Sequence, residues 1–104
     1  MASKKTVITA ALTGVLANRS QCPYIPYTPV EIAEEAKRAT DAGAAILHIH
    51  ARKPDGLPAY DIETYKQIGE EVRKRVPNAI LNYSTGAIGI SQQERIHHVT
   101  ALKP

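Results

Sequence analysis

The chain has 104 residues, 43% hydrophobic and 22% charged, so it has an ordinary globular composition and room for one modest core. Its net charge of +3 comes from lysines and arginines interspersed with glutamates, as in EEAKRA and EEVRKR, which argues against nucleic acid as a partner. No apolar run is long enough to span a membrane, and a single cysteine, Cys22, allows no internal disulfide, so we expect no membrane partner and a cytoplasmic location.

The first part of the chain predicts a strand and a long loop. TVITAAL (6–12) is rich in β-branched residues and suits a strand buried on both faces. Residues 1–20 resemble a secretion signal, but their threonines and Gly14 favour the strand. A loop containing two prolines follows over residues 13–27.

A helix and a second strand come next. Thr28 caps the helix, Pro29 takes its first position, Glu31 completes a capping box, and Gly43 ends it. AAILHIHA (44–51) is an apolar run that predicts the second strand.

The next unit repeats this order. A loop over residues 52–61 leads into a second helix, roughly 62–76, which stops at Pro77. Its inner face is expected to carry Ile62, Tyr65, Gly69, Val72 and Val76.

A third strand and helix close the pattern. The strand is AILNYSTG (79–86), and AIGI (87–90) is a short loop. The helix, residues 91–102, opens with a capping box formed by Ser91 and Glu94.

The order βαβαβα predicts an α/β fold with parallel strands joined by right-handed crossovers. Ile46 and Ile80 are equivalent strand positions, which gives a repeat of 34 residues. A (β/α)8 TIM barrel allots about 31 residues to each unit, although an open doubly wound sheet has similar spacing. Because three strands cannot close a barrel, we expect residues 1–104 to be the N-terminal fragment of a single TIM-barrel domain, its first three βα units.

Two histidines stand at the end of the second predicted strand. Because side chains alternate along a strand, His48 and His50 point to one face, and Leu47 and Ile49 point to the other, under the helices. The histidines then face the barrel interior at the carboxyl end of their strand, where barrels place active sites. Two such imidazoles can bind one metal ion, and an open zinc site often has two histidines and a carboxylate. A pair of buried, hydrogen-bonded histidines is the alternative.

The third strand ends in residues that suit ligand binding. Ser84 can hydrogen-bond a polar ligand, and Gly86 lets backbone N–H groups approach a carboxylate or carbonyl oxygen. The same stretch is equally suited to turning the chain. After His50, Arg52 and Asp55 are either groups that orient a ligand or parts of a salt-bridged loop.

Two more histidines lie on the third predicted helix. His97 and His98 are adjacent there and diverge by about 100° around the axis, so they cannot readily share a metal ion. We expect both at the surface or at an interface.

Three motifs in order resemble one enzyme family. They are TAALTG on the first strand, YTPVEIAEEAKRATDAGAAILHIHARKPDGLPA through the second strand, and LNYSTGA on the third. Together they resemble the β-keto acid cleavage enzymes, which include 3-keto-5-aminohexanoate cleavage enzyme, over nearly all of the chain.

The resemblance implies a zinc-dependent (β/α)8 barrel that converts a β-keto acid and acetyl-CoA into acetoacetate and a new CoA thioester. His48 and His50 match the family's histidine zinc ligands, and Ser84 and Gly86 match its substrate-binding strand end. Zinc would polarise the keto acid's carbonyl and stabilise the enolate. The family's glutamate ligand and its catalytic arginine and aspartate come from late strands, beyond Pro104. The resemblance also implies a homo-oligomer.

One position departs from the family pattern. Near Leu16, members that act on the amino-substituted acid carry a carboxylate that can pair with the substrate's ammonium group. Leu16 removes that charge, so an uncharged or differently charged keto acid fits this substrate-binding residue better.

Two other functions fit the same sequence. A metal-dependent hydrolase or aldolase-type lyase on this fold would also use the histidine pair, and acetyl-CoA-dependent formation of acetoacetate separates it from the first function. A non-catalytic half-barrel module would self-associate through its strand edges and bind zinc at best weakly.

Overall fold

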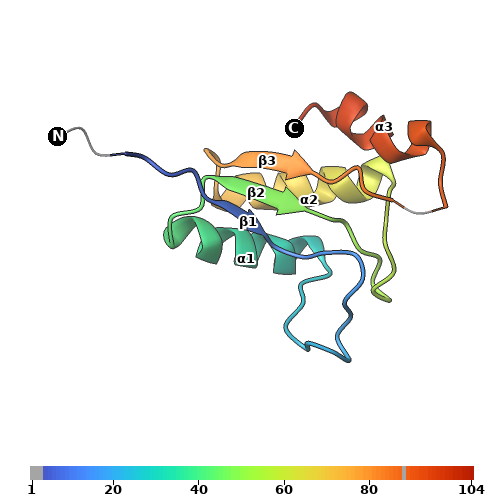
Figure 1. Ribbon diagram of the computed structural model, residues 1–104, viewed down its shortest axis with the longest axis horizontal. Helices are drawn as coiled ribbons and strands as arrows, with labels where there is room; N and C mark the ends of the chain where they lie inside the picture. The colour runs from blue at the N-terminus through green and yellow to red at the C-terminus, as the bar shows by residue number, and fades with distance from the viewer. Residues whose placement is uncertain (1–3, 88) are drawn as a thin grey trace.

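Strands and helices alternate along the chain in the computed structural model, which describes residues 4–87 and 89–104 (Figure 1). The elements are β1 (Thr9–Ala11), α1 (Pro29–Asp41), β2 (Ile46–Ile49), α2 (Ile62–Arg75), β3 (Ile80–Tyr83) and α3 (Gln92–Leu102). The expected order βαβαβα is therefore confirmed. Two parts of the expected features lie outside the described residues, namely positions 1–3 of the signal-like stretch and Ile88 of the loop 87–90.

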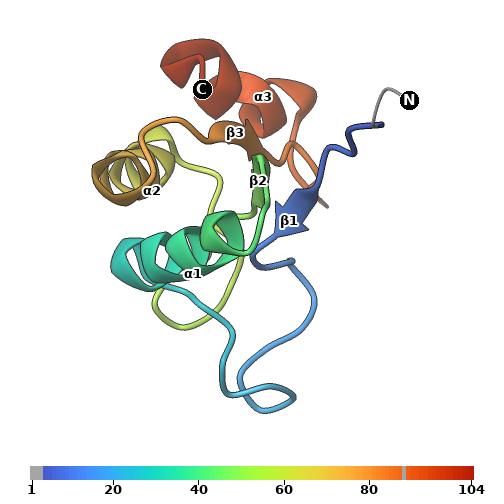
Figure 2. The same cartoon turned by 90° about the vertical axis from the view of Figure 1, so that its left-hand side faces the viewer.

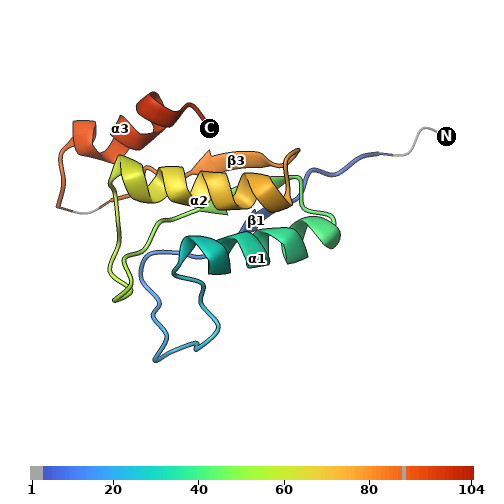
Figure 3. The ribbon, with the colours of Figure 1, turned by 180° about the vertical axis from the view of Figure 1, so that it is seen from behind.

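The strands form a parallel sheet in the order β1-β2-β3. Ile46 pairs with Ile80, so the 34-residue repeat is a true register between β2 and β3. Helices α1 and α2 cover one face of this sheet, as Figure 2 shows from the side and Figure 3 from behind. The fold is α/β, and the described residues form an open parallel sheet.

Strand β1 differs from its expectation. The residues 6–12 were expected to form a strand buried on both faces, but β1 covers only Thr9–Ala11, and Val7 and Ile8 before it are 69% and 49% exposed. Among the described residues the strand pairs only with β2, at the sheet edge, and helices α1 and α2 cover a single face of the sheet. An apolar, β-branched run indicates burial only where neighbouring elements supply it.

The expected helix starts are confirmed. The Thr28 hydroxyl accepts from the Glu31 N–H at 3.2 Å, and the Glu31 carboxylate reaches back to the backbone of Thr28. That carboxylate also accepts from the Tyr27 N–H at 2.9 Å, which is the main reason why the pKa of Glu31 is lowered. A second capping box opens α3. No helix in the described part of the chain is long and apolar enough to cross a membrane.

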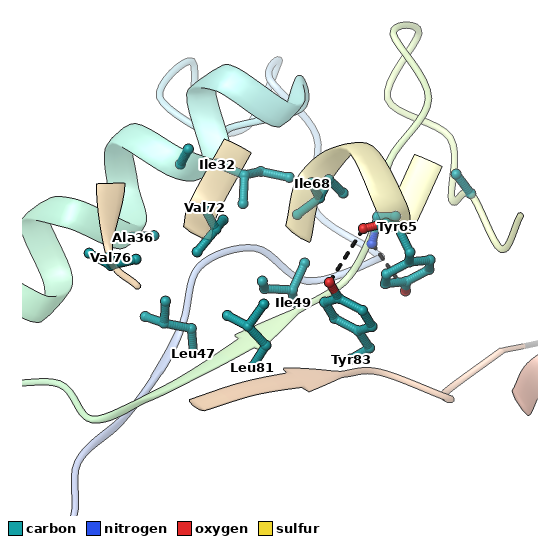
Figure 4. Packing of buried hydrophobic residues seen from close by; sticks show 13 residues of the cluster. Ile32, Ala36, Leu47, Ile49, Tyr65, Ile68, Val72, Val76, Leu81 and Tyr83 are labelled. Carbon is teal, nitrogen blue, oxygen red and sulfur yellow. Dashed lines mark hydrogen bonds between the residues drawn. The ribbon is translucent and has the colours of Figure 1, made fainter. Parts of the chain in front are cut away.

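The core lies between the sheet and the two covering helices (Figure 4). It includes Leu47 and Ile49 of β2, Leu81 and Tyr83 of β3, Ile32 and Ala36 of α1, and Tyr65, Ile68 and Val72 of α2. The expected inner face of α2 is confirmed except at Ile62, which is 37% exposed at the first turn. A methyl group at Gly69 would overlap the Tyr83 hydroxyl, so this glycine lets the ring lie directly against the helix.

Candidate active site

The carboxyl ends of the three strands point the same way, and the loops that follow them gather at that edge of the sheet (Figure 1). His48 lies within β2, and His50 directly follows its last residue. Leu47 and Ile49 are fully buried in the core, whereas both histidines are half-buried on the opposite face. The alternation expected from the sequence therefore places the two imidazoles together, away from the helices.

The backbone around the histidines is fixed from both sides. The His48 carbonyl accepts from the Leu12 N–H at 3.2 Å, and the Ile49 carbonyl accepts from the Ser84 N–H at 2.9 Å. Beyond His50, the Ala51 N–H donates to the buried Tyr65 hydroxyl at 3.2 Å. The pair thus stands on rigid backbone rather than on a free loop.

The imidazoles meet through their Nε2 atoms, which are 3.2 Å apart. On its other side, the His48 ring binds the Oδ1 atom of Asn82, its register partner on β3. Because an amide oxygen only accepts, the His48 Nδ1 atom carries a proton in this contact, and in the neutral ring Nε2 then presents a lone pair. This is the second contact that metal-bound histidines usually make.

The donor set can be compared with what zinc requires. Two nitrogens bound to one tetrahedral Zn²⁺ at about 2.0–2.1 Å lie about 3.3 Å apart. The observed separation of 3.2 Å between the Nε2 atoms agrees with that value, and it also allows an N–H···N hydrogen bond when no metal is present. The pair therefore fits two ligands of one zinc ion. In residues 4–87 and 89–104, no group of three or more His, Cys, Asp or Glu side chains is placed to hold a metal ion.

The electrostatics around His50 favour its neutral form. Burial is the largest cause that lowers the pKa of His50, and the neighbouring His48 and Arg52 lower it further. Neutral imidazole is the form that binds a metal ion. The surroundings of His50 therefore favour the neutral form that can bind a metal ion.

A pocket of about 390 Å³ opens beside His50. It is lined by Val15 and Leu16 after β1, by His50, Pro58 and Tyr60 after β2, and by Gly86 and Ala87 after β3. Leu16 lies at its rim and is 84% exposed. The structure thus brings Leu16, Gly86 and one of the two histidines to a single, mostly apolar hollow.

The strand end Ser84–Gly86 is internally bonded. Ser84 is buried, and its hydroxyl accepts from the Gly86 N–H at 3.1 Å. That donor is already used within the turn, while the Ser84 hydroxyl keeps its own proton for another acceptor. The residues therefore turn the chain, and their place beside the pocket leaves ligand binding through the Ser84 hydroxyl as a proposal.

His98 corrects an expectation. It was expected at the surface or an interface, but its ring is fully buried and stacks on Tyr65 with 4.1 Å between ring centroids. Its Nε2–H donates to the Ser84 carbonyl at 2.8 Å. The reason is that α3 packs against α2, so that of the two adjacent histidines His98 points into the protein. His97 is half-buried and binds the Tyr60 carbonyl at 2.7 Å.

The stability of the fold is expected to depend on the pH through His98. Burial is the largest cause that lowers the pKa of this ring; the hydrogen bond to the Ser84 backbone raises the pKa, and the neighbouring His97 lowers it. The rings of Tyr65 and Tyr83 face His98 from α2 and β3. Below about pH 6.5 the unfolded chain therefore binds a proton that the folded chain does not, and the free energy of unfolding falls as the pH drops. Urea unfolding at about pH 7 and about pH 5 measures this loss. The part due to this ring disappears in His98→Phe, and an unchanged pH dependence there would contradict the assignment.

Arg52 and Asp55 do not form the salt bridge that one interpretation expected. In the described ranges neither side chain belongs to an ion pair. The Asp55 carboxylate accepts from the Leu57 N–H at 3.0 Å, and Arg52 is buried among backbone carbonyls. Asn82 was missed by the sequence analysis, although the 34-residue repeat pairs it with His48.

Parallel βα units with polar side chains at the carboxyl ends of the strands are typical of α/β folds such as barrels and doubly wound sheets. Comparison with known proteins identifies the family. The chain belongs to the beta-keto acid cleavage enzyme family, whose model matches residues 5–104.

Similar proteins are named as a cleavage enzyme and as an acetyl-CoA acetyltransferase. The 3-keto-5-aminohexanoate cleavage enzyme of Acetoanaerobium sticklandii is 41% identical over 102 residues, which are 97% of this chain and 37% of that protein. The 3-oxoadipate:acetyl-CoA acetyltransferase of Cupriavidus necator is 33% identical over 89 residues, or 86% of this chain and 31% of that protein. The chain thus spans about a third of the length of these relatives.

Solved structures share the fold of this chain. The apo structure of ObcA is 34% identical and superposes with a TM-score of 0.63, covering 74% of this chain and 20% of that one. A ternary complex of ObcA with a C4-CoA adduct and oxalate matches with the same TM-score at 33% identity.

Proposed function

We propose that the chain supplies the first three βα units of a zinc-dependent β-keto acid cleavage enzyme built as a (β/α)8 barrel. In the reaction, the acyl group of a 3-keto acid moves from its C2 carbon to the sulfur of CoA, and the acetyl group of acetyl-CoA moves from that sulfur to C2. The products are acetoacetate and a new acyl-CoA, so all atoms are accounted for. Family membership supports this proposal, as do two relatives named as acetyl-CoA-dependent transferases.

The observation that carries the proposal is the histidine pair. His48 and His50 would hold the metal through the Nε2 atoms that lie 3.2 Å apart, with Asn82 holding the His48 ring in the required tautomer. When bound, zinc would supply a Lewis acid that polarises the keto group and stabilises enolate charge. Further ligands, and the acid and base, would come from chain outside these residues.

The other site residues would bind and orient the keto acid. Ser84 has a hydroxyl proton to offer a carboxylate or carbonyl oxygen at the end of β3, and Gly86 leaves room there. The acyl substituent would enter the pocket past Leu16. Because His50 is the one described lining residue that ionises near neutral pH, an uncharged substituent suits this pocket better than an ammonium group.

The test is an assay of the full-length protein with acetyl-CoA and a 3-keto acid whose substituent is uncharged, such as 3-oxopentanoate. Acetoacetate that forms only when acetyl-CoA is present supports the proposal. Decarboxylation, hydrolysis or aldol cleavage that needs no acetyl-CoA would instead favour a metal-dependent hydrolase or lyase on the same fold. Absence of any turnover by zinc-loaded protein would favour a non-catalytic module.

Removing the support of His48 is expected to weaken metal binding. Asn82→Ala leaves the Nε2 atoms of both histidines in place but removes the hydrogen bond that orients the His48 ring. Loss of such an outer partner lowers metal affinity by about 10- to 100-fold. Competition with a chelator measures the change. Asn78→Ala, an exposed asparagine at the other end of β3, is the matched control. Equal zinc affinity in wild type and Asn82→Ala would show that the asparagine does not support a ligand.

A further inference from the structure

Arg52 is a buried cation that lies two residues after His50. Its side chain is buried, with the residue only 3% exposed. The Nε atom donates to the Gly56 carbonyl at 2.6 Å, Nη1 donates to the Gly14 carbonyl at 2.6 Å, and Nη2 donates to the Ala17 carbonyl. One guanidinium therefore joins the loop after β1 to the loop after β2.

The carbonyls that Arg52 binds belong to residues that flank the pocket lining in the sequence. Gly14 and Ala17 stand immediately before and after Val15 and Leu16, which line one side of the pocket. Gly56 belongs to the loop whose Pro58 lines another side, and Arg52 itself forms a β-bridge with Pro58. The positions of both walls thus depend on the same side chain.

The charge of Arg52 is balanced without an acid. In residues 4–87 and 89–104 no carboxylate pairs with it, and its guanidinium lies 4.9 Å from the centre of the Tyr27 ring. Arg19 lies over the same ring at 4.2 Å. A planar fork with several fixed donors can hold separate carbonyls in one plane, whereas a lysine ammonium is a single point of charge.

We propose that Arg52 is a positioning residue that sets the shape of the acyl pocket and thereby the acyl chain that the protein selects. This inference rests on the proposed function. Arg52 would hold Val15 and Leu16 at the distance from Pro58 at which an unbranched alkyl group of a 3-keto acid is buried between them. Loosening the guanidinium contacts would widen the pocket and leave that group in water.

The test compares two substrates of the full-length protein, 3-oxoheptanoate and 3-oxopentanoate, which differ by two CH₂ groups. Burial of both groups would give the wild type about a 15-fold preference in kcat/KM for the longer acid, from about 0.8 kcal/mol for each CH₂. Arg52→Lys is expected to reduce this preference to about twofold or less. Hydrogen exchange of the segment 14–17 should be faster in the variant.

Two controls separate positioning from general damage. Arg73→Lys alters another arginine that binds backbone carbonyls, those of Pro77 and Ala79, at the opposite end of the sheet, and it should keep the wild-type preference. In a Leu16→Ala background, Arg52→Lys should cause a smaller further loss of preference than in the wild type, because one of the two side chains that it positions is gone. If Arg52→Lys does not fold, Tyr27→Leu removes the ring beneath the guanidinium and carries the same expectation.

The possible failures are distinguishable. A wild type that converts neither acid overturns the proposed function and the inference with it. A wild type that converts both, with the same preference in Arg52→Lys, overturns the inference alone. An equal loss of preference in Arg73→Lys also overturns it, because the effect would then not depend on the pocket wall.

Discussion

His50→Ala in the full-length protein is expected to lose its bound zinc and its ability to form acetoacetate. The variant removes one of two Nε2 atoms that converge within 3.2 Å of each other. Loss of a ligand should reduce zinc affinity by more than the roughly 10- to 100-fold caused by loss of an outer partner, and turnover should fall with the metal content. Zinc content and acetoacetate formation are measured on the same sample.

His97→Ala is the matched control for that experiment. This histidine is half-buried on α3, and its ring binds the Tyr60 carbonyl rather than either member of the pair. It should keep the zinc content of the wild type. If His50→Ala kept both zinc and turnover, the assignment of His50 as a ligand would be wrong.

His98→Ala is expected to lower the free energy of unfolding by about 3 kcal/mol, the scale for truncating a large buried ring. The ring is fully buried, and it stacks on Tyr65. His98→Phe keeps the stacking but removes the hydrogen bond to the Ser84 carbonyl. In the described part of the chain, the Tyr65 hydroxyl, 3.4 Å away, is then the remaining protein donor to that carbonyl. The free energy of unfolding should therefore fall by only about 1–2 kcal/mol.

Urea unfolding of the two variants beside wild type measures these differences. A surface histidine would give changes within about 0.5 kcal/mol in both variants. Such small changes would contradict the burial of His98. Equal large losses in the two variants would contradict the contribution of the stacked ring.

Local patterns predicted most of the fold because each rests on neighbouring residues. The capping boxes at Thr28 and Ser91 need only the residue three places on, and the alternation around His48 needs only strand periodicity. The prediction that β1 is buried on both faces was wrong because it did not rest on neighbouring residues. Whether an apolar strand is buried depends on which elements cover it in the assembled sheet.

The candidate site was only partly predictable. The histidine pair could be found because its two members are adjacent on one strand face. Asn82 required the strand register, which the 34-residue repeat contains but which the sequence analysis did not extend to side chains. The contacts of Arg52 could not be found, since its partners are backbone carbonyls, which every residue carries. The direction of His98 depends on how α3 docks against α2.

The most direct test of the metal site is an anomalous difference map at the zinc edge from crystals of the full-length protein. A peak bonded to the Nε2 atoms of both His48 and His50, at about 2.0–2.1 Å from each, is the predicted result. The contrary result is a fully occupied zinc peak elsewhere in the protein, with the two imidazoles hydrogen-bonded to each other. The histidines would then be a structural pair at a strand end.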